Sequence, residues 1–362
     1  MITTSSGPAF HGHTLAHALS HWAQHRPVDT AFRYLIDGEQ KAVAKTFAQL
    51  ERDALAVAAA LVECTEPGDR ALLLYPRGLD FIAAFLGCVY AGVVAVPACP
   101  PQRGRLDRAL PRLQAIAADS GAGLVLTSRS KNAALVDALA SCPSLARLPR
   151  IATDNLRSAD DPMLFADHAL ASLDPRGVAF VQYTSGATRT PQGTTVTHTH
   201  LMQDAECIRS AFRHDDRFVG VAWLPIDHDR GSLCDLLQPL YLGRPCTLLA
   251  PLDFLKRPAR WLQAISRYRA TTSGAPDFAY ALCARNVSDE DKKGLDLSSW
   301  QVAHVGAEPI RPATLERFAA AFGSCGFRRE AFQPASGMIE SPRRPTIASP
   351  ARRAALGVPA AH

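Results

Sequence analysis

The segment from Val178 to His200, VAFVQYTSGATRTPQGTTVTHTH, guides the interpretation of the whole chain. An apolar, β-branched run at 178–183 predicts a buried strand. Small and hydroxylated residues follow at 184–188, and after a second β-branched run we expect a helix from about Thr199. Such a loop exposes backbone N–H groups and hydroxyls in one small concavity, which suits a nucleotide phosphate. A Ser/Thr-rich turn between two strands is the structural alternative.

Composition indicates a soluble globular protein. The chain has 362 residues, 47% of them hydrophobic and 20% charged, so it can bury a large core in one large domain or two subdomains. A net charge of +5 with scattered arginines gives no support to nucleic-acid binding. Nine dispersed cysteines without a CxxC pair indicate reduced thiols in a cytoplasm rather than a metal site.

A run without charged residues from Phe81 to Ala98 approaches membrane-spanning length. Glycine and proline interrupt it, so we predict a buried helix at 81–90 that turns at Gly92 into a buried strand at 93–96, and no membrane span. The N-terminal segment lacks a basic region followed by an apolar core, so no secretory signal is expected.

Strand and helix patterns alternate through the first half of the chain, which predicts a mostly parallel sheet covered on both faces. The predicted elements are helices at 12–25, 46–62, 106–118 and 132–139 and strands at 69–74 and 124–127, with a hairpin turn at Asp37-Gly38. We expect a loop at 97–105, because its prolines cannot join a central ladder, and a surface connection at 141–176. His17, His21 and His25 share one helix face, where surface histidines are commoner than a metal site.

The motif YTSGATRTPQGT at 183–194 resembles the phosphate loop of the adenylate-forming superfamily, which includes acyl-CoA synthetases, luciferases and peptide-synthetase adenylation domains. It is most similar to the loop of fatty acyl-AMP ligases, which usually reads TSGSTRTP. Gln192 stands where the superfamily commonly has a lysine. The resemblance implies that ATP phosphates are bound by Thr184, Ser185, Gly186, Ala187 and Thr188.

A second motif, LPIDHDRG at 224–231, is similar to the LPxxHxxG pattern of the superfamily. A lone histidine after a strand is by default structural, but the resemblance places His228 beside the acyl carboxylate, as a catalytic residue that gates the substrate tunnel. The segment 236–285 carries the narrowest similarity to fatty acyl-AMP ligases. Within it Phe254, Phe278 and Tyr280 are candidates for lining an acyl tunnel, and core filling explains them equally well.

Two further segments match the nucleotide site of the family. Gly306, Ala307 and Glu308 correspond to residues that lie against adenine, where a glycine lets the backbone approach the flat base. Ser336, Gly337 and Met338 fill the next adenine-binding positions, with Ser336 replacing the tyrosine that stacks on the base. Glu340 corresponds to the catalytic carboxylate that binds Mg²⁺, a hard oxygen ligand suited to that ion.

The resemblance implies an α/β fold: the large N-terminal domain of adenylate-forming enzymes, with stacked, mostly parallel sheets and flanking helices, C-terminally truncated. Residues 1–341 would form an incomplete AMP-binding domain, and the Pro-, Arg- and Ala-rich residues 342–362 an unrelated disordered tail produced by frameshift or truncation. The small C-terminal domain would be absent.

The implied activity is ATP- and Mg²⁺-dependent activation of a medium- or long-chain fatty acid to acyl-adenylate. The acyl group would then pass to an acyl carrier protein or a polyketide or peptide synthetase in the cytoplasm. An inactive remnant or a binding module of the same family is the alternative, favoured by Gln192, Ser336 and the foreign tail. An acyl-CoA synthetase is a weaker option, because Arg189 stands where those enzymes have glycine.

Overall fold

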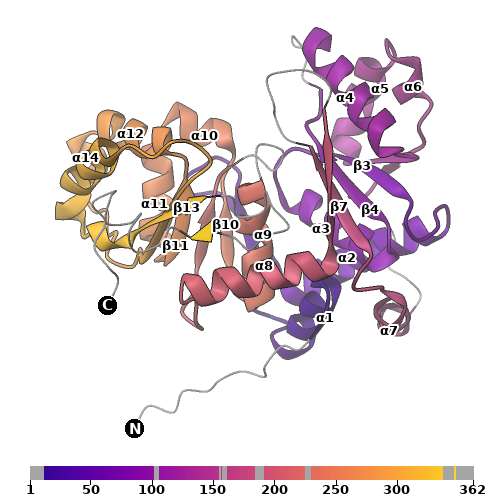
Figure 1. Ribbon diagram of the computed structural model, residues 1–362, viewed down its shortest axis with the longest axis horizontal. Helices are drawn as coiled ribbons and strands as arrows, with labels where there is room; N and C mark the ends of the chain where they lie inside the picture. The colour runs from indigo at the N-terminus through magenta and orange to yellow at the C-terminus, as the bar shows by residue number, and fades with distance from the viewer. Residues whose placement is uncertain are drawn as a thin grey trace. The chain divides into compact units, whose positions relative to one another are not determined.

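Two compact units, each built around its own sheet, make up the chain (Figure 1). The computed structural model describes residues 12–101, 106–154, 156, 161–183, 191–224, 230–336 and 346–347. Unit 1 contains residues 1–29, 45–202 and 226–229, and unit 2 contains residues 30–44, 203–225 and 230–362. Mostly parallel strands flanked by helices confirm the predicted α/β fold class.

Unit 1 has a six-stranded sheet in the order β6-β5-β3-β4-β7-β8. Its strands are β3 (Arg70–Leu74), β4 (Val94–Ala98), β5 (Leu124–Thr127), β6 (Arg150–Ala152), β7 (Val178–Tyr183) and β8 (Gly193–Thr197). All neighbours are parallel except β7 and β8, which are antiparallel. Its helices are α1 (Leu15–His25), α2 (Phe47–Val62), α3 (Leu79–Ala91), α4 (Leu106–Ser120), α5 (Arg129–Leu139), α6 (Pro143–Ala146) and α7 (Pro162–Ser172), in two packed groups, α1–α3 with α7 and α4–α6 (Figure 1).

Local sequence signals explain the helix ends of unit 1. The Thr46 side chain accepts from the backbone N–H of Gln49, and the Gln49 side chain accepts from the backbone N–H of Thr46, so a capping box starts α2, the helix predicted at 46–62. Gly92 ends α3 in the left-handed region at φ 69°, and β4 begins two residues later. The apolar run at 81–98 is therefore core, and none of the helices described is long and apolar enough to cross a membrane.

Two expectations for unit 1 were wrong. Pro97 lies in the central strand β4, opposite Leu73, although we expected its segment to be a loop. On its other side β4 pairs with β7 at Ala95, which is opposite Phe180. Pro97 lies two residues beyond this contact, so its missing N–H does not interrupt the ladder between β4 and β7. The interval 141–176 contains α6, β6 and α7 instead of a plain connection. In α7 only Ala166 is buried, so no apolar periodicity marked it.

Unit 2 has an eight-stranded sheet in the order β14-β13-β12-β11-β9-β10-β1-β2. Its strands are β1 (Thr30–Leu35), β2 (Ala42–Thr46), β9 (Gly220–Ala222), β10 (Cys246–Leu248), β11 (Thr272–Ala275), β12 (Val302–Val305), β13 (Phe332–Ser336) and β14 (Thr346–Ile347). Its helices are most of α8 (His198–Ala211) and α9 (Arg230–Leu242), α10 (Pro251–Lys256), α11 (Ala259–Tyr268), α12 (Asp277–Asn286), α13 (Asp289–Lys292) and α14 (Pro312–Phe322). Within this order, the neighbouring strands β13, β12, β11, β9, β10 and β1 are all paired in parallel.

An aromatic core fills unit 2 between the sheet and helices α11, α12 and α14. Its fully buried members include Trp261, Tyr280, Trp300, Phe318 and Phe332. Polar tips in this core are paired, because Trp261 donates to Ser273 Oγ at 2.8 Å and the Tyr280 hydroxyl donates to the backbone oxygen of His304 at 2.9 Å.

Of the three aromatic residues proposed to line an acyl tunnel, two belong to this core. Tyr280 is fully buried, and so is Phe254, which stacks on Trp223 with ring centroids 3.9 Å apart. Phe278 is 38% exposed. The core-filling alternative therefore accounts for Phe254 and Tyr280.

Candidate functional site

The carboxyl ends of four neighbouring parallel strands in unit 2 meet at one edge of its sheet. These strands, β9, β11, β12 and β13, end at Ala222, Ala275, Val305 and Ser336. Ligands of open α/β sheets bind at such edges. Three of the predicted site segments follow these ends, at His228 after β9, at 306–308 after β12 and at 337–340 after β13. Of these three segments the structure describes 306–308, which lies at this edge directly after β12.

Several predicted site residues lie outside the part of the chain that the structure describes. They are Thr184, Ser185, Gly186, Ala187, Thr188, His228, Gly337, Met338 and Glu340. Ser336 is placed by its backbone as the last residue of β13. Gly306, Ala307 and Glu308 are described in full.

The segment 306–308 forms a tight turn after β12. Ala307 has φ 66°, a left-handed conformation that costs a non-glycine residue roughly 1–2 kcal/mol. Surrounding contacts fix the turn, since Glu308 Oε1 accepts from the backbone N–H of Phe278 at 2.6 Å. The turn thus lies against the first residues of α12, with Ala307 exposed and Gly306 partly buried.

Asp277 anchors the far end of the same turn, a role that the sequence interpretation missed. This carboxylate is fully buried and accepts from the backbone N–H of Arg311 at 2.9 Å, from Arg311 Nε at 2.9 Å and from Thr314 Oγ1 at 3.0 Å. An aspartate directly after Pro276, in the first turn of α12, was the available signal. Glu308 and Asp277 together fix the end of the turn and the residues that follow it against the start of α12.

The predicted phosphate loop is flanked by two paired strands in unit 1. Tyr183 at the end of β7 is opposite Gly193 at the start of β8. A Cβ at Gly193 would lie 2.9 Å from the Tyr183 hydroxyl, so the close approach requires glycine. That hydroxyl donates to Asp119 Oδ2 at 2.6 Å, and burial, followed by the Asp119 carboxylate, raises the pKa of Tyr183. Both sides of the loop are therefore fixed, and Gln192 beside it is exposed.

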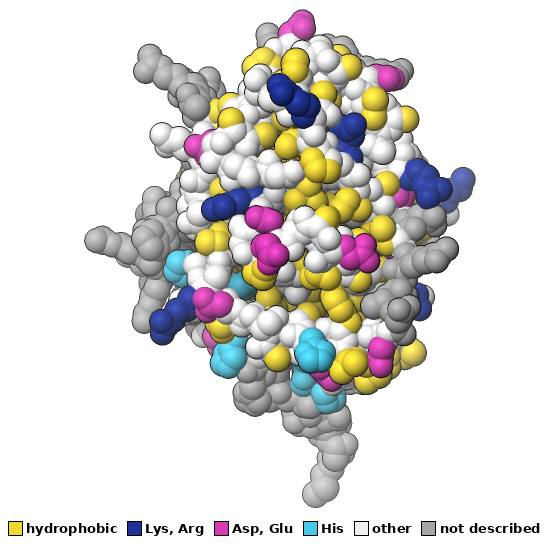
Figure 2. Space-filling model, turned by 90° about the vertical axis from the view of Figure 1, so that its right-hand side faces the viewer, with side chains coloured by type: hydrophobic (Ala, Val, Ile, Leu, Met, Phe, Trp, Pro, Cys, Tyr) yellow, Lys and Arg dark blue, Asp and Glu magenta, His cyan; other side chains and the backbone are white. Residues whose placement is uncertain are grey.

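Surface charge and histidines add no further site among the described residues. On the face shown in Figure 2, basic side chains lie apart and acidic side chains stand between them, so no basic patch is present there. Within the described ranges no group of three His, Cys, Asp or Glu side chains could hold a metal ion. On α1, His17 is hydrogen-bonded to Thr14 at 2.8 Å, and His21 and His25 stack with ring centroids 4.2 Å apart.

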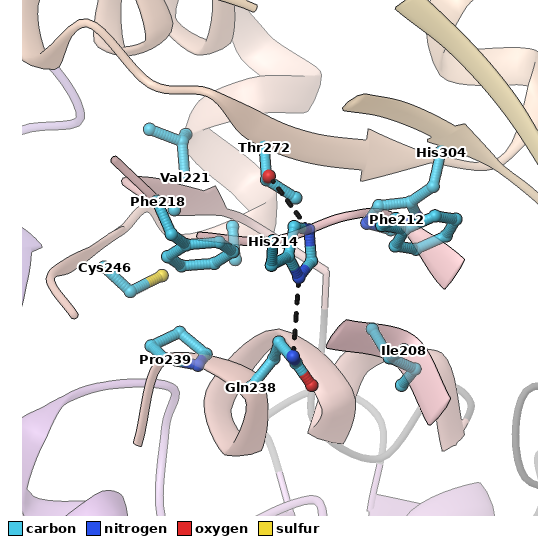
Figure 3. Close-up of a pocket in the computed structure, with 12 residues that line it drawn as sticks. Ile208, Phe212, His214, Phe218, Val221, Gln238, Pro239, Cys246, Thr272 and His304 are labelled. Carbon is cyan, nitrogen blue, oxygen red and sulfur yellow. Dashed lines mark hydrogen bonds between the residues drawn. The ribbon is translucent and has the colours of Figure 1, made fainter. Parts of the chain in front are cut away.

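A cavity of about 30 Å³ lies between the sheet of unit 2 and helices α8 and α9 (Figure 3). Strands β9, β10, β11 and β12 supply one wall, and Gln238 of α9 and Ile208 of α8 belong to the other. The lining residues are Ile208, Phe212, His214, Phe218, Gly220, Val221, Ala222, Gln238, Pro239, Cys246, Thr272 and His304. The wall is thus mainly apolar, with a small number of polar side chains, as in many ligand cavities.

The polar side chains of the cavity form a chain of hydrogen bonds (Figure 3). His214 Nδ1 lies 3.4 Å from Gln238 Nε2, and His214 Nε2 lies 3.2 Å from Thr272 Oγ1. Burial, and after it the charge of His304, lowers the pKa of His214 to about 3. The ring is therefore neutral at pH 7, with Nδ1 accepting from the Gln238 amide and Nε2–H donating to Thr272.

Known relatives are fatty acid-activating ligases. The chain is 41% identical over 329 residues to the medium-chain-fatty-acid–[acyl-carrier-protein] ligase JamA of Moorena producens, covering 91% of this chain and 55% of that protein. It is 36% identical over 327 residues to the long-chain-fatty-acid–AMP ligase FadD23 of Mycobacterium tuberculosis, covering 87% and 54%. The chain thus spans about half the length of the curated relatives it matches.

Solved structures and a family model agree with this similarity. The fatty acyl-adenylate ligase from L. pneumophila, in complex with acyl adenylate and pyrophosphate, superimposes with a TM-score of 0.78 at 36% identity, over 90% of this chain and 55% of that one. This match confirms the predicted large-domain fold of adenylate-forming enzymes and the resemblance to fatty acyl-AMP ligases. The family model described as AMP-binding enzyme matches residues 19–332. The chain therefore belongs to the family of AMP-binding enzymes.

Proposed function

We propose that the parent activity of this chain is ATP-dependent activation of a fatty acid. A carboxylate oxygen of the acid attacks the α-phosphorus of ATP, the bond to the pyrophosphate breaks, and acyl-adenylate and pyrophosphate form. Positioning of the two substrates and neutralisation of charge account for most of the catalysis in such a transfer. By analogy with the carrier-protein ligases among its relatives, the acyl group then passes to an acyl carrier protein.

One observation supports the proposal best: the turn at 306–308, fixed at the carboxyl edge of the sheet by Glu308 and Asp277. In this position the backbone of Gly306 is accessible to a flat base. His304, two residues before Gly306 in the sequence, lines the apolar cavity between the sheet and helices α8 and α9. An adenylate at the edge would thus have a place for its base and a place for the end of its acyl chain in the same unit.

Further roles come from the matching motifs. Thr184, Ser185, Gly186, Ala187 and Thr188 bind the phosphates, Gly337 and Met338 complete the adenine site with Ser336, and His228 borders the carboxylate. Glu340 supplies a hard oxygen ligand for Mg²⁺, which neutralises phosphate charge when bound.

Acyl-AMP formation tests the proposal directly. The purified chain is incubated with ATP, Mg²⁺ and fatty acids of several lengths, and acyl-AMP is measured by mass spectrometry. We expect product from the wild-type chain and at least a tenfold loss in Gly306→Val, whose side chain would occupy the space of the base. Gly323→Ala is the matched control, since nothing lies within 4 Å of its added Cβ.

A folded wild-type chain that makes no acyl-AMP, beside an active full-length relative, would contradict the proposal. Retained binding of ATP or fatty acid by such a chain would then favour the binding-module alternative.

A further inference from the structure

One buried polar group in the cavity has no hydrogen-bond partner. Gln238 is 4% exposed, and its Oε1 lacks a donor, whereas its Nε2 is used by His214. A buried acceptor left unpaired costs about 1–3 kcal/mol. Because Gln238 lines the cavity, a ligand that brings a donor there would recover this cost.

Two small residues of β9 line the cavity, and the side chains of Cys246 and Phe218 lie close beside Gly220, since a Cβ there would be 3.0 Å from Cys246 Sγ. Gly220 and Ala222 are two residues apart and therefore face the same side of the strand, and both line the cavity. On the neighbouring β11, the ring of His304 covers Gly274, since a Cβ there would lie 2.0 Å from His304 Nδ1. A chain that reaches Gln238 from the carboxyl edge would run along the cavity side of the sheet to the level of Thr272, which is opposite Gly220.

The sheet register gives the length of this path. Val305 is opposite Ala275, so Gly306 is level with residue 276, four residues beyond Thr272. At about 3.3 Å per residue this is roughly 13 Å, the length of an extended acyl chain of about ten carbons. The cavity itself, at about 30 Å³, has room for one small polar group at the end of such a chain.

We propose that the acyl substrate is a medium-chain fatty acid with a terminal or near-terminal hydroxyl, which donates to Gln238 Oε1 beside Thr272 and His214. This inference rests on the proposed fatty acid activation and specifies its substrate class. A site built to pair with a hydroxyl discriminates strongly against the analogue that lacks it, because its own polar group then stays unpaired. The neutral His214 orients the Gln238 amide and leaves the carbonyl for the substrate.

Binding of matched acids by the whole chain tests the inference. Isothermal titration compares decanoic acid, 10-hydroxydecanoic acid and the 8- and 12-carbon ω-hydroxy acids, without ATP. We expect 10-hydroxydecanoic acid to bind at least tenfold more tightly than decanoic acid. In Gln238→Met, which keeps the side-chain length and removes the acceptor, this preference should fall to less than threefold. Leu237→Met, a buried neighbour on the same helix that does not line the cavity, should keep it.

Equal binding of the two ten-carbon acids, which indicates that the cavity holds only water, would overturn the inference. An unchanged preference in Gln238→Met, or no binding of any acid, would overturn it as well. A tenfold preference in binding without acyl-AMP formation would instead contradict the proposed function alone. Tighter binding of 9-oxodecanoic acid than of the hydroxy acid would reverse the donor assignment at Gln238 and also overturn the inference.

Discussion

At the scale of single residues, Asp277 connects the start of α12 to the start of α14, just after the turn at 306–308. Replacing it with alanine leaves the buried hydroxyl of Thr314 and the backbone N–H of Arg311 without their acceptor. We expect Asp277→Ala to lower the free energy of unfolding by about 2–3 kcal/mol, measured by urea denaturation. Asp289→Ala, whose side chain is 97% exposed, should change stability by less than about 0.5 kcal/mol. Similar losses in the two variants would contradict the anchoring role.

Single residues also show where sequence interpretation reached its limit. Gly306, Ala307 and Glu308 could be selected because they match a motif, and Gly92 because a glycine between a helix and a strand has a local conformational meaning. Asp277 could not be linked to Arg311, 34 residues away, since only the folded chain brings the two together. The hydrogen-bonded pair of Gln238 and His214 in the cavity went unpredicted for the same reason.

At the scale of elements, close packing of β12 on β11 makes Gly274 indispensable. Any Cβ at this position would overlap the ring of His304, which lines the cavity, so Gly274→Ala must displace that ring. We expect a loss of about 1–3 kcal/mol in the free energy of unfolding, together with a cavity too small for the acyl end. Chemical denaturation of this variant and of Gly123→Ala, where nothing lies within 4 Å, checks the expectation. Equal stability of Gly274→Ala and the wild type would refute it.

Elements with a strong local pattern were predictable, and those set by tertiary contacts were not. The regularly spaced apolar positions of α2 predicted that helix from sequence alone, and the structure adds the capping box at Thr46. By contrast, α7 buries only Ala166, so its apolar pattern was uninformative, although Asp161 caps it and Pro162 begins it. We expected Pro97 in a loop because a proline lacks the N–H that a central strand needs. The pairing of β4 with β7 is short and does not reach Pro97, so the strand tolerates the proline.

At the scale of the whole molecule, each unit contains a buried histidine with a lowered pKa. Burial is the main cause for both, lowering the pKa of His198 in unit 1 to about 4 and that of His214 in unit 2 to about 3. Below pH 6.5 the unfolded chain binds protons at these two histidines that the folded chain does not bind. The free energy of unfolding that they contribute is therefore fully present above pH 6.5 and decreases as the pH falls toward 4.

The expected decrease is about 1.4 kcal/mol per pH unit for each histidine between pH 6.5 and about 4. Urea denaturation at pH 7, 6 and 5 measures it in the wild type and in His198→Gln. The variant should lose less stability on acidification, by roughly 1–2 kcal/mol between pH 6.5 and pH 5. Parallel pH profiles for the two proteins would disprove the assignment to His198.

The pairing of Tyr183 with Gly193 has an evolutionary consequence. Because the ladder between β7 and β8 joins both ends of the intervening segment, the entropy of closing that loop is supplied by the sheet and does not depend on the loop's own sequence. Substitutions within 184–190 can therefore be selected for the phosphate binding that we propose for this loop, with little effect on folding. Such a separation would let the loop adapt to its ligand while the paired strands keep the stability of the unit.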